Sequence, residues 1–165
     1  VRQFKASDKT PLTVVLDDVR SMYNVGSVFR TADSFRLEKI MLCGITACPP
    51  HPEIHKTALG AELSMEWKKC ENTIEAVNKL HEEGYEVYAL EQVEHSVPLQ
   101  NFKVEHGKKY ALILGNEVKG VSQEAVNISD GAIEIPQFGT KHSMNVSVSG
   151  GIAIWQIASQ LLKLQ

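Results

Sequence analysis

Three short polar stretches hold the residues of this sequence whose types and spacing could do chemistry. In the first, Asn24 and Arg30 stand on either side of Gly26, at the start and in the second turn of a predicted helix. Gly26 would let a partner approach closely. Arg30 is always charged, and its fork of donors suits phosphate. The alternative is a surface ion pair between Arg30 and Asp33 or Glu38, without a functional role.

The second stretch, Gly-Asn-Glu-Val-Lys-Gly from Gly115 to Gly120, lies between an apolar segment at 110–114 and a short predicted helix near 122–126. It lacks the Gly-x-Gly-x-x-Gly spacing of dinucleotide-binding loops and the Gly-Lys-Ser/Thr of phosphate-binding loops, which disfavours an NAD or ATP site. A loop between a strand and a helix is a common place for a small-molecule site. In the alternative, the two glycines only turn the chain and Glu117 is solvated.

The third stretch spans 135–147 and places Ser143, Asn145 and Ser147 directly before an apolar segment. Serine and asparagine at such positions cap helices, and the first turn of a helix offers exposed backbone donors to a ligand. Capping of the last helix by Ser143 or Asn145 would explain these residues without a ligand. The two roles are compatible.

The three stretches need a scaffold, and the hydrophobic pattern predicts a mostly parallel α/β sheet flanked by helices. Short apolar runs predict buried strands, and apolar residues at i, i+3 and i+4 predict helices between them. Alternating strands and helices are typical of parallel sheets, which bind ligands at the carboxyl ends of their strands. The predicted strands are 12–16, 39–43, 86–90, 110–114 and 132–135, and the predicted helices are 25–35, 73–84 with Asn72 as its cap, 122–126 and 146–164.

The last of these helices has apolar residues on more than one face. Such a helix needs burial on several sides. It is either a core helix of this domain, which periodicity alone favours, or a helix that also contacts a second subunit.

The composition is that of an ordinary globular protein of one domain. The chain has 165 residues, 43% of them hydrophobic, and a formal net charge of −3, so any nucleic-acid site must be local. The three cysteines form no paired framework, which indicates a reducing compartment. The sequence shows neither an apolar run of the roughly 18 residues that span a membrane nor an apolar signal segment. We therefore expect a cytoplasmic protein with no membrane partner.

Cys48, His51 and His55 are spaced closely enough to be weighed as a zinc site. A fourth protein ligand is not evident, and three prolines stiffen the segment. We therefore expect a surface loop at 48–55 and no metal.

Taken in order, the three stretches resemble the three motifs of the SpoU (TrmH-type) RNA ribose methyltransferases of the SPOUT superfamily. Three ordered motifs are far more specific than one, and the similarity covers about 12–164. A departure is Arg36, which stands where many relatives have Gly. The matching residues are Asn24-x-Gly-x-x-x-Arg30, Leu114-Gly-Asn-Glu117-x-x-Gly120 and Ile135-Pro-x-x-Gly139-x-x-x-Ser143-Met-Asn145-Val-Ser147.

The resemblance implies a homodimeric enzyme that transfers methyl from S-adenosylmethionine to a ribose 2′-hydroxyl of tRNA or rRNA without a metal. It also implies a deep trefoil knot in the carboxyl-terminal part, a rare exception among protein chains. The whole of 1–165 would be one catalytic domain with an amino-terminal extension at 1–11. Because we expect no separate RNA-binding domain, the catalytic domain itself would have to recognise the RNA.

By motif matching, the family's catalytic residues are Arg30, Asn24, Glu117, Ser143 and Asn145 in this chain. Arg30 would position the ribose and stabilise developing charge, because a pKa above about 12 makes it a poor base. Asn24 would hold Arg30 or the ribose, and Glu117 would anchor the cofactor loop. Ser143 and Asn145 would orient Arg30 or the nucleotide. The implied cofactor contacts are Leu90, Gly115, Asn116, Glu117, Gly120, Ile135, Ser143, Met144 and Asn145.

RNA binding has to overcome the negative net charge. Two of the candidates for it, Lys56 and Lys141, could equally be ordinary solvated lysines. One rival function is a non-catalytic RNA-binding or assembly protein on the same knotted fold, which the intact motifs disfavour. Another is methylation of bases, which the ribose-type motifs disfavour. The candidates for RNA binding are Arg20, Arg30, Lys56, Lys141 and His142.

Overall fold

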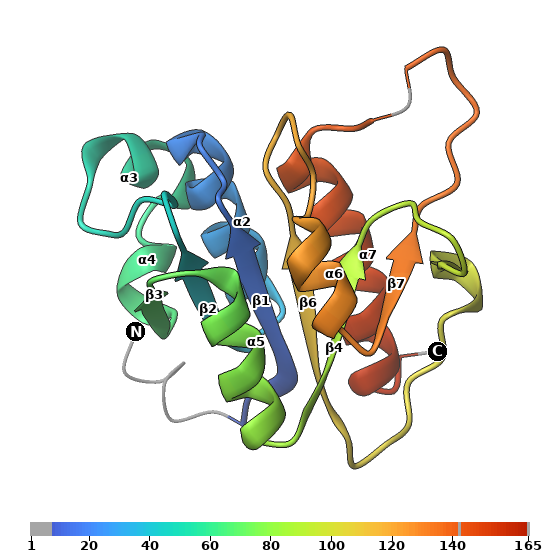
Figure 1. The fold of residues 1–165 in the computed structure, drawn as a ribbon. Coiled ribbons are helices and arrows are strands. Elements are labelled where there is room, and N and C mark those ends of the chain that lie inside the picture. The colour runs from blue at the N-terminus through green and yellow to red at the C-terminus, as the bar shows by residue number, and fades with distance from the viewer. Residues whose placement is uncertain (1–7, 142, 165) are drawn as a thin grey trace.

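The computed structural model describes residues 8–141 and 143–164, and its centre is one seven-stranded sheet (Figure 1). The strand order is β3-β2-β1-β6-β4-β7-β5, and every neighbouring pair is parallel. The prediction of a mostly parallel sheet is therefore confirmed. The strands are β1 (Thr10–Asp17), β2 (Leu37–Cys43), β3 (Trp67–Cys70), β4 (Tyr85–Leu90), β5 (Val97–Pro98), β6 (Lys109–Leu114) and β7 (Gly131–Glu134).

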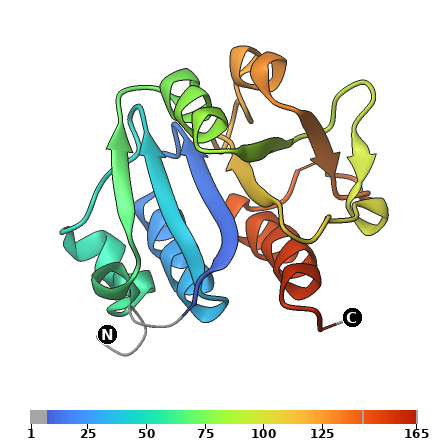
Figure 2. The same ribbon diagram turned by 90° about the horizontal axis from the view of Figure 1, so that it is seen from below.

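Helices cover both faces of this sheet, as Figure 2 shows from below. α2 and α7 lie on one face, and α5 and α6 lie on the other. Each face thus has its own hydrophobic core, and the central strands are buried on both sides. In β1, Val14 packs in the core with α2 and α7, and Val15 packs in the core with α5 and α6. The helices are α2 (Met22–Ser34), α3 (Pro52–Ala58), α4 (Ala61–Ser64), α5 (Thr73–Glu82), α6 (Gln123–Ile128) and α7 (Val146–Leu161), with a 3-10 helix η1 (Leu99–Asn101).

All five predicted strands are present, but the sequence did not indicate β3 or β5. β3 carries two exposed lysines at the edge of the sheet, and β5 has only two residues, so neither shows an apolar run. The predicted cap of α5 is confirmed, because the Asn72 side chain accepts a hydrogen bond from the Glu75 N–H. The expected loop at 48–55 is wrong in its second half, where α3 begins at Pro52 with His51 as its cap.

α7 divides its apolar residues between two environments. Ala153, Ile154 and Ile157 are buried against the sheet. Ile152 and Trp155 are 42% and 47% exposed on another side of the same helix. The helix is thus a core helix on one side and presents unburied apolar side chains on the other.

Gly26 lets α2 pack unusually closely against α3. A Cβ atom at this position would lie 2.0 Å from Thr57 Oγ1 and 2.3 Å from the carbonyl oxygen of Ile54. The Thr57 hydroxyl also donates a hydrogen bond to the carbonyl oxygen of Tyr23. The partner that Gly26 admits within this chain is therefore α3. At the other end of α2, Arg36 has a φ of 53°, a conformation that favours glycine.

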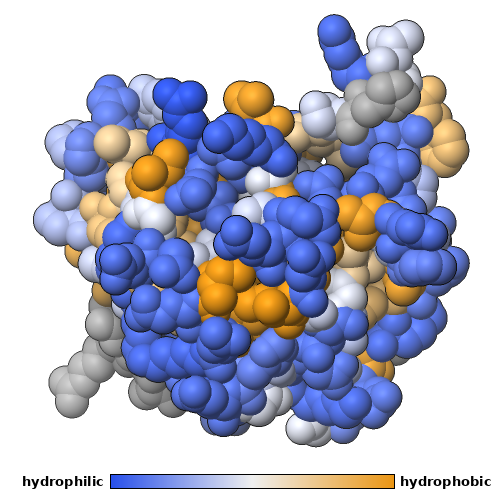
Figure 3. All heavy atoms as spheres, in the orientation of Figure 1, coloured by the Kyte–Doolittle hydropathy of each residue, from blue (hydrophilic) through white to orange (hydrophobic). Residues whose placement is uncertain are grey.

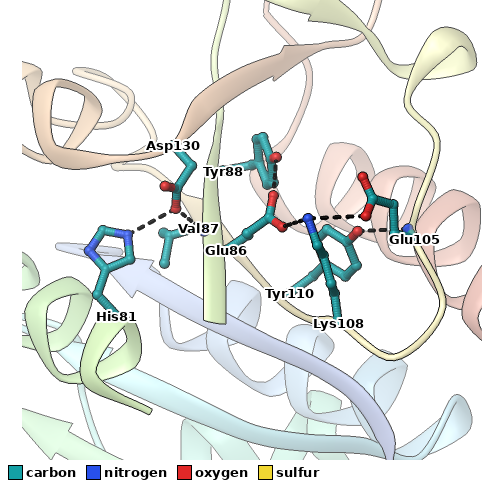
Figure 4. Close-up of polar contacts among 8 residues, drawn as sticks. All are labelled: His81, Glu86, Val87, Tyr88, Glu105, Lys108, Tyr110 and Asp130. Atoms are coloured by element: carbon teal, nitrogen blue, oxygen red, sulfur yellow. Dashed lines mark hydrogen bonds and ion pairs between the residues drawn. The ribbon is translucent and has the colours of Figure 1, made fainter. Parts of the chain in front are cut away.

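A polar network stands near the amino ends of β4 and β6 (Figure 4). Glu86 pairs with Lys108 at 2.7 Å and accepts a hydrogen bond from the Tyr88 hydroxyl, also at 2.7 Å. Nearby, Asp130 Oδ2 accepts the N–H of Val87 at 2.7 Å. These contacts fix β4 between its two neighbouring strands at the end opposite the polar loops.

Replacing Gly26 by Ala is expected to destabilise the protein, because α3 backbone atoms occupy the place of the new methyl group. The free energy of unfolding should fall by about 1–3 kcal/mol, as for an overpacked core. Gly151→Ala is the matched control, since a Cβ there meets nothing within 4 Å and α7 should gain up to about 1 kcal/mol in helix propensity. Urea denaturation of both variants checks this. Equal stabilities would contradict the packing role of Gly26.

The network around Glu86 predicts a pH-dependent contribution to stability. Hydrogen bonds from Lys108 and Tyr88 lower the pKa of Glu86. A lowered pKa stabilises the fold above the ordinary carboxylate pKa, and this contribution is lost as pH falls through the lower folded value. Glu86→Gln should therefore lower the free energy of unfolding near neutral pH, by less than about 1 kcal/mol because the side chain is partly exposed. In thermal melts, the difference from wild type should shrink as pH falls below the ordinary glutamate pKa of about 4.3 and vanish below the lowered pKa of the folded state; a constant difference would refute it.

Candidate active site

A cavity of about 250 Å³ opens at the carboxyl ends of β4, β6 and β7. Three loops and the start of α7 form it, so segments far apart in the sequence meet there (Figure 1). This is the edge at which parallel sheets bind ligands. Its lining residues are Leu90, Glu91, Gln92, Leu114, Gly115, Asn116, Glu117, Val118, Lys119, Gly120, Glu134, Ile135, Gln137, Ser143, Met144, Val146 and Ser149.

The loop from Gly115 to Gly120 closes on itself. The N–H of Asn116 donates to the carbonyl of Gly120 at 3.1 Å, and the N–H of Gly120 donates back at 2.9 Å. The Asn116 side chain accepts the N–H groups of Val118 and Lys119. The loop therefore has a defined shape that presents backbone groups along the cavity.

Glu117 joins this loop to the amino end of α2. Its carboxylate accepts the N–H groups of Arg20 at 2.9 Å and Ser21 at 2.8 Å, and the side-chain amide of Asn24 at 3.0 Å. Burial alone would raise the pKa of Glu117, but these hydrogen bonds together outweigh it and lower the pKa. The alternative of a freely solvated Glu117 is therefore wrong. The arrangement unites the first and second motifs.

Arg30 lies on α2 beyond Asn24, and it is exposed. The alternative ion pair is not formed: Asp33 accepts the Ser64 hydroxyl at 3.1 Å, and Glu38 accepts the Tyr85 hydroxyl. Within residues 8–141 and 143–164, the Arg30 guanidinium has no hydrogen bond or ion pair. Within that part of the chain, nothing else engages its donors.

The third motif divides between the cavity and the start of α7. Ser143 and Met144 line the cavity. Asn145 instead caps α7, because its side-chain oxygen accepts the N–H groups of Ser147 at 2.9 Å and Val148 at 3.3 Å. All the residues expected to contact the cofactor except Asn145 are therefore in the lining.

Several lining residues went unnoticed in the sequence. Glu91, Gln92 and Glu134 follow or end predicted strands, and Lys119 lies inside the second motif. The sequence could have indicated them only by their position at the carboxyl ends of neighbouring parallel strands. Polar residues at such positions are candidates for a site even where no motif includes them.

The candidate RNA-binding residues lie on different elements, and among the described residues no hydrogen bond joins one of them to another. Arg20 is exposed beside the cavity, and its N–H binds Glu117. Lys56 pairs with Glu53 at 2.9 Å on α3. Lys141 is exposed on the segment between β7 and α7, which stands away from the rest of the surface in Figure 3. His142 lies outside the described residues.

The histidines of the 48–55 segment have other partners. His51 Nδ1 accepts the N–H of Glu53 at 3.1 Å, and His55 Nδ1 lies 2.7 Å from a carboxylate oxygen of Glu62. Across the described part of the chain, no group of three or more His, Cys, Asp or Glu side chains is placed to hold a metal ion. In the same residues, no helix is both long and apolar enough to cross a membrane.

Comparison with known proteins places this site in a family. Residues 11–155 match the model of the SpoU rRNA Methylase family. The chain is 32% identical to an uncharacterized tRNA/rRNA methyltransferase of Borreliella burgdorferi, covering 90% of this chain and 64% of the relative. It is 31% identical to the tRNA (guanosine(18)-2'-O)-methyltransferase of Thermus thermophilus, covering 92% and 76%.

A solved structure gives the same assignment. An AdoMet-bound rRNA methyltransferase from Sinorhizobium meliloti superposes with a TM-score of 0.85 at 26% identity, covering 96% of this chain and 60% of that one. The family match spans the three motifs that form and border the cavity. On these grounds the chain belongs to the SpoU methylase family.

Proposed function

We propose that this protein transfers the methyl group of S-adenosylmethionine to a ribose 2′-hydroxyl of tRNA or rRNA. The observation that carries the proposal is one cavity lined by the second and third motifs and tied by Glu117 to the first. The names of the relatives, which are tRNA and rRNA methyltransferases, support it. Because the chain spans only 64% of the Borreliella relative, the substrate of the whole protein is part of the proposal.

The cavity fits the methyl donor chemically. Leu90, Ile135 and Met144 give it apolar walls suited to an adenine ring, and the loop beginning at Gly115 supplies backbone donors and acceptors. The lining carboxylate of Glu134 suits a cationic ligand. S-adenosylmethionine, when bound, supplies a methyl group activated by the sulfonium.

The chain's own residues then have to align and stabilise the attacking ribose. The 2′-oxygen forms the bond to the methyl carbon as the sulfur–carbon bond breaks, and the hydroxyl proton leaves to solvent. Arg30 stabilises the charge that develops on the oxygen, because its guanidinium is exposed and has no partner among the described residues. Asn24 holds the start of α2 against Glu117. Ser143 orients the nucleotide from the cavity wall, and Asn145 fixes the start of α7.

The same proposal covers RNA recognition and the path of the carboxyl-terminal segment. Residues 1–165 form one catalytic domain that itself recognises RNA, with Arg20, Lys56, Lys141 and His142 beside Arg30 as contacts, in the cytoplasm. The carboxyl-terminal segment forms the trefoil knot. Support comes from its path: it leaves β7 near one edge of the sheet, borders the loop after β6, and enters α7 under β1 and β6. A cofactor-bound crystal structure tests this path.

We also propose a homodimer that uses the exposed side of α7. Val148, Ile152 and Trp155 follow i, i+4 and i+7 spacing, and the Trp155 ring lies 5.5 Å from the ring of Phe35 near the end of α2. Apolar side chains that form one stripe indicate a partner surface.

Ile152→Glu combined with Trp155→Glu is therefore expected to give a monomer. Two carboxylates within a buried apolar interface would be desolvated without partners. Analytical ultracentrifugation at micromolar concentration measures the mass. Leu63→Glu is the control, because Leu63 is 67% exposed on α4, away from this stripe. A dimeric double variant, or a monomeric wild type, would contradict the proposed interface.

The central prediction concerns catalysis by Arg30. Wild-type protein should bind S-adenosylmethionine in isothermal titration and transfer tritiated methyl groups to bulk tRNA or rRNA in an alkali-stable form. Arg30→Ala should keep cofactor binding within about threefold and lose at least about 100-fold in kcat, the scale on which a lost charge-stabilising donor acts.

Arg36→Ala is the matched control, an exposed arginine at the far end of α2 from the cavity, and should retain activity. Normal transfer by Arg30→Ala would overturn the role given to Arg30. Binding of RNA by wild type without binding of the cofactor would instead favour a non-catalytic RNA-binding protein, and alkali-labile methyl incorporation would favour modification of bases.

A further inference from the structure

Glu91 connects all the strands that end at the cavity. It follows β4 directly, and its own N–H donates to the carbonyl of Ile133 in β7 at 3.0 Å. Its carboxylate reaches the segment after β6, where Oε2 accepts the N–H of Val121 at 3.0 Å. Oε1 accepts the N–H of the adjoining Gln92 at 3.1 Å. One residue therefore links β4, β6 and β7 at their carboxyl ends.

The carboxylate of Glu91 also sits directly against Gly120. A Cβ atom on Gly120 would lie 2.2 Å from Glu91 Oε2, and the backbone there has a φ of 71°. Gly120 closes the cofactor loop through its two hydrogen bonds with Asn116. Glu91 thus contacts the carboxyl end of that loop, where the positive φ favours glycine.

Two carboxylates consequently hold the loop from opposite sides. Glu117 leaves the loop and binds the amino end of α2. The Glu91 side chain, which follows β4, accepts the N–H of Val121 directly after the loop. Val121 is 6% exposed, so without Glu91 its N–H would lack both an acceptor and ready access to water.

We propose that Glu91 is a positioning residue for the methyl donor, acting through the backbone of Gly120 and Val121. The inference rests on the proposed function, because the donor is the ligand assigned to this cavity. The contact with Val121 requires a hydrogen-bond acceptor, which the single oxygen of a glutamine also provides, while the N–H of the exposed Gln92 can turn to water. Retention of function in Glu91→Gln and loss in Glu91→Ala is therefore the signature of this role.

The test compares Glu91→Ala, Glu91→Gln and the control Glu94→Ala, whose side chain is 89% exposed in the same segment. Glu91→Ala should raise the Kd and KM for S-adenosylmethionine at least fivefold while kcat changes less than threefold. Glu91→Gln and Glu94→Ala should remain within twofold of wild type. Without cofactor, the amides of Gly120 and Val121 should exchange hydrogen faster in Glu91→Ala than in wild type, and in the other two variants they should exchange at the wild-type rate.

The possible failures are distinguishable. Absence of cofactor binding by wild type contradicts the proposed function. Cofactor binding by wild type together with unchanged Kd and exchange in Glu91→Ala overturns the role of Glu91. Equal weakening in Glu91→Gln also overturns it, because charge rather than hydrogen-bond acceptance would then matter. Should Glu91→Ala fail to fold, Glu91→Met decides: it keeps the length of the side chain, removes the acceptor for Val121 and should weaken binding equally.

Discussion

The candidate site depends on the hydrogen bonds that the Glu117 carboxylate accepts. A partly buried carboxylate without donors would be unfavourable, but here two backbone N–H groups and the Asn24 amide satisfy it. The two N–H groups belong to the start of α2, where the helix dipole also favours negative charge. Residues more than 90 positions apart in the chain are thereby joined. With the hydrogen bond from the Asn116 side chain to the carbonyl oxygen of Asp18, this junction fixes the loop at 115–120 against the helix that carries Arg30.

The parallel sheet explains why these groups meet at one edge. Because helices cover both faces, the central strands are apolar along their length, and polar side chains are confined to the strand ends. β6 stands between β1 and β4, so the loop after β6 borders both the start of α2 and the residues after β4. Glu117 uses the first of these neighbours and Glu91 the second. The loop is therefore held by the order of the strands as well as by its own sequence.

The sequence predicted those parts of the structure that depend on local pattern. Apolar runs located five strands, and the side chain of Asn72 identified a helix start. α3 was missed because its prolines suggested a loop, although proline in the first turn after a capping residue is compatible with a helix. Asn145 had both a capping role and a ligand role open to it, and the structure shows the cap.

Long-range contacts could not be predicted from the sequence, because they depend on which strands pair. The acceptor role of Glu91 depends on Val121, which is 30 residues away and comes close only because β4 and β6 are paired. Nothing in the residues around either position indicates that contact. The motifs predicted which residues gather, whereas the pairing of strands decides which atoms touch.

Charge is distributed in a way that suits the two proposed ligands. Glu117 and Glu134 line the cavity with the single lysine Lys119, a balance of charge that suits a sulfonium cation better than a phosphate. Arg30, by contrast, is exposed and unpaired among the described residues. In the proposed function, a phosphate backbone would therefore approach from the side of α2, and the methyl donor would occupy the cavity. This separation would, in the proposed function, let a chain with a net charge of −3 bind an anionic polymer through local cations.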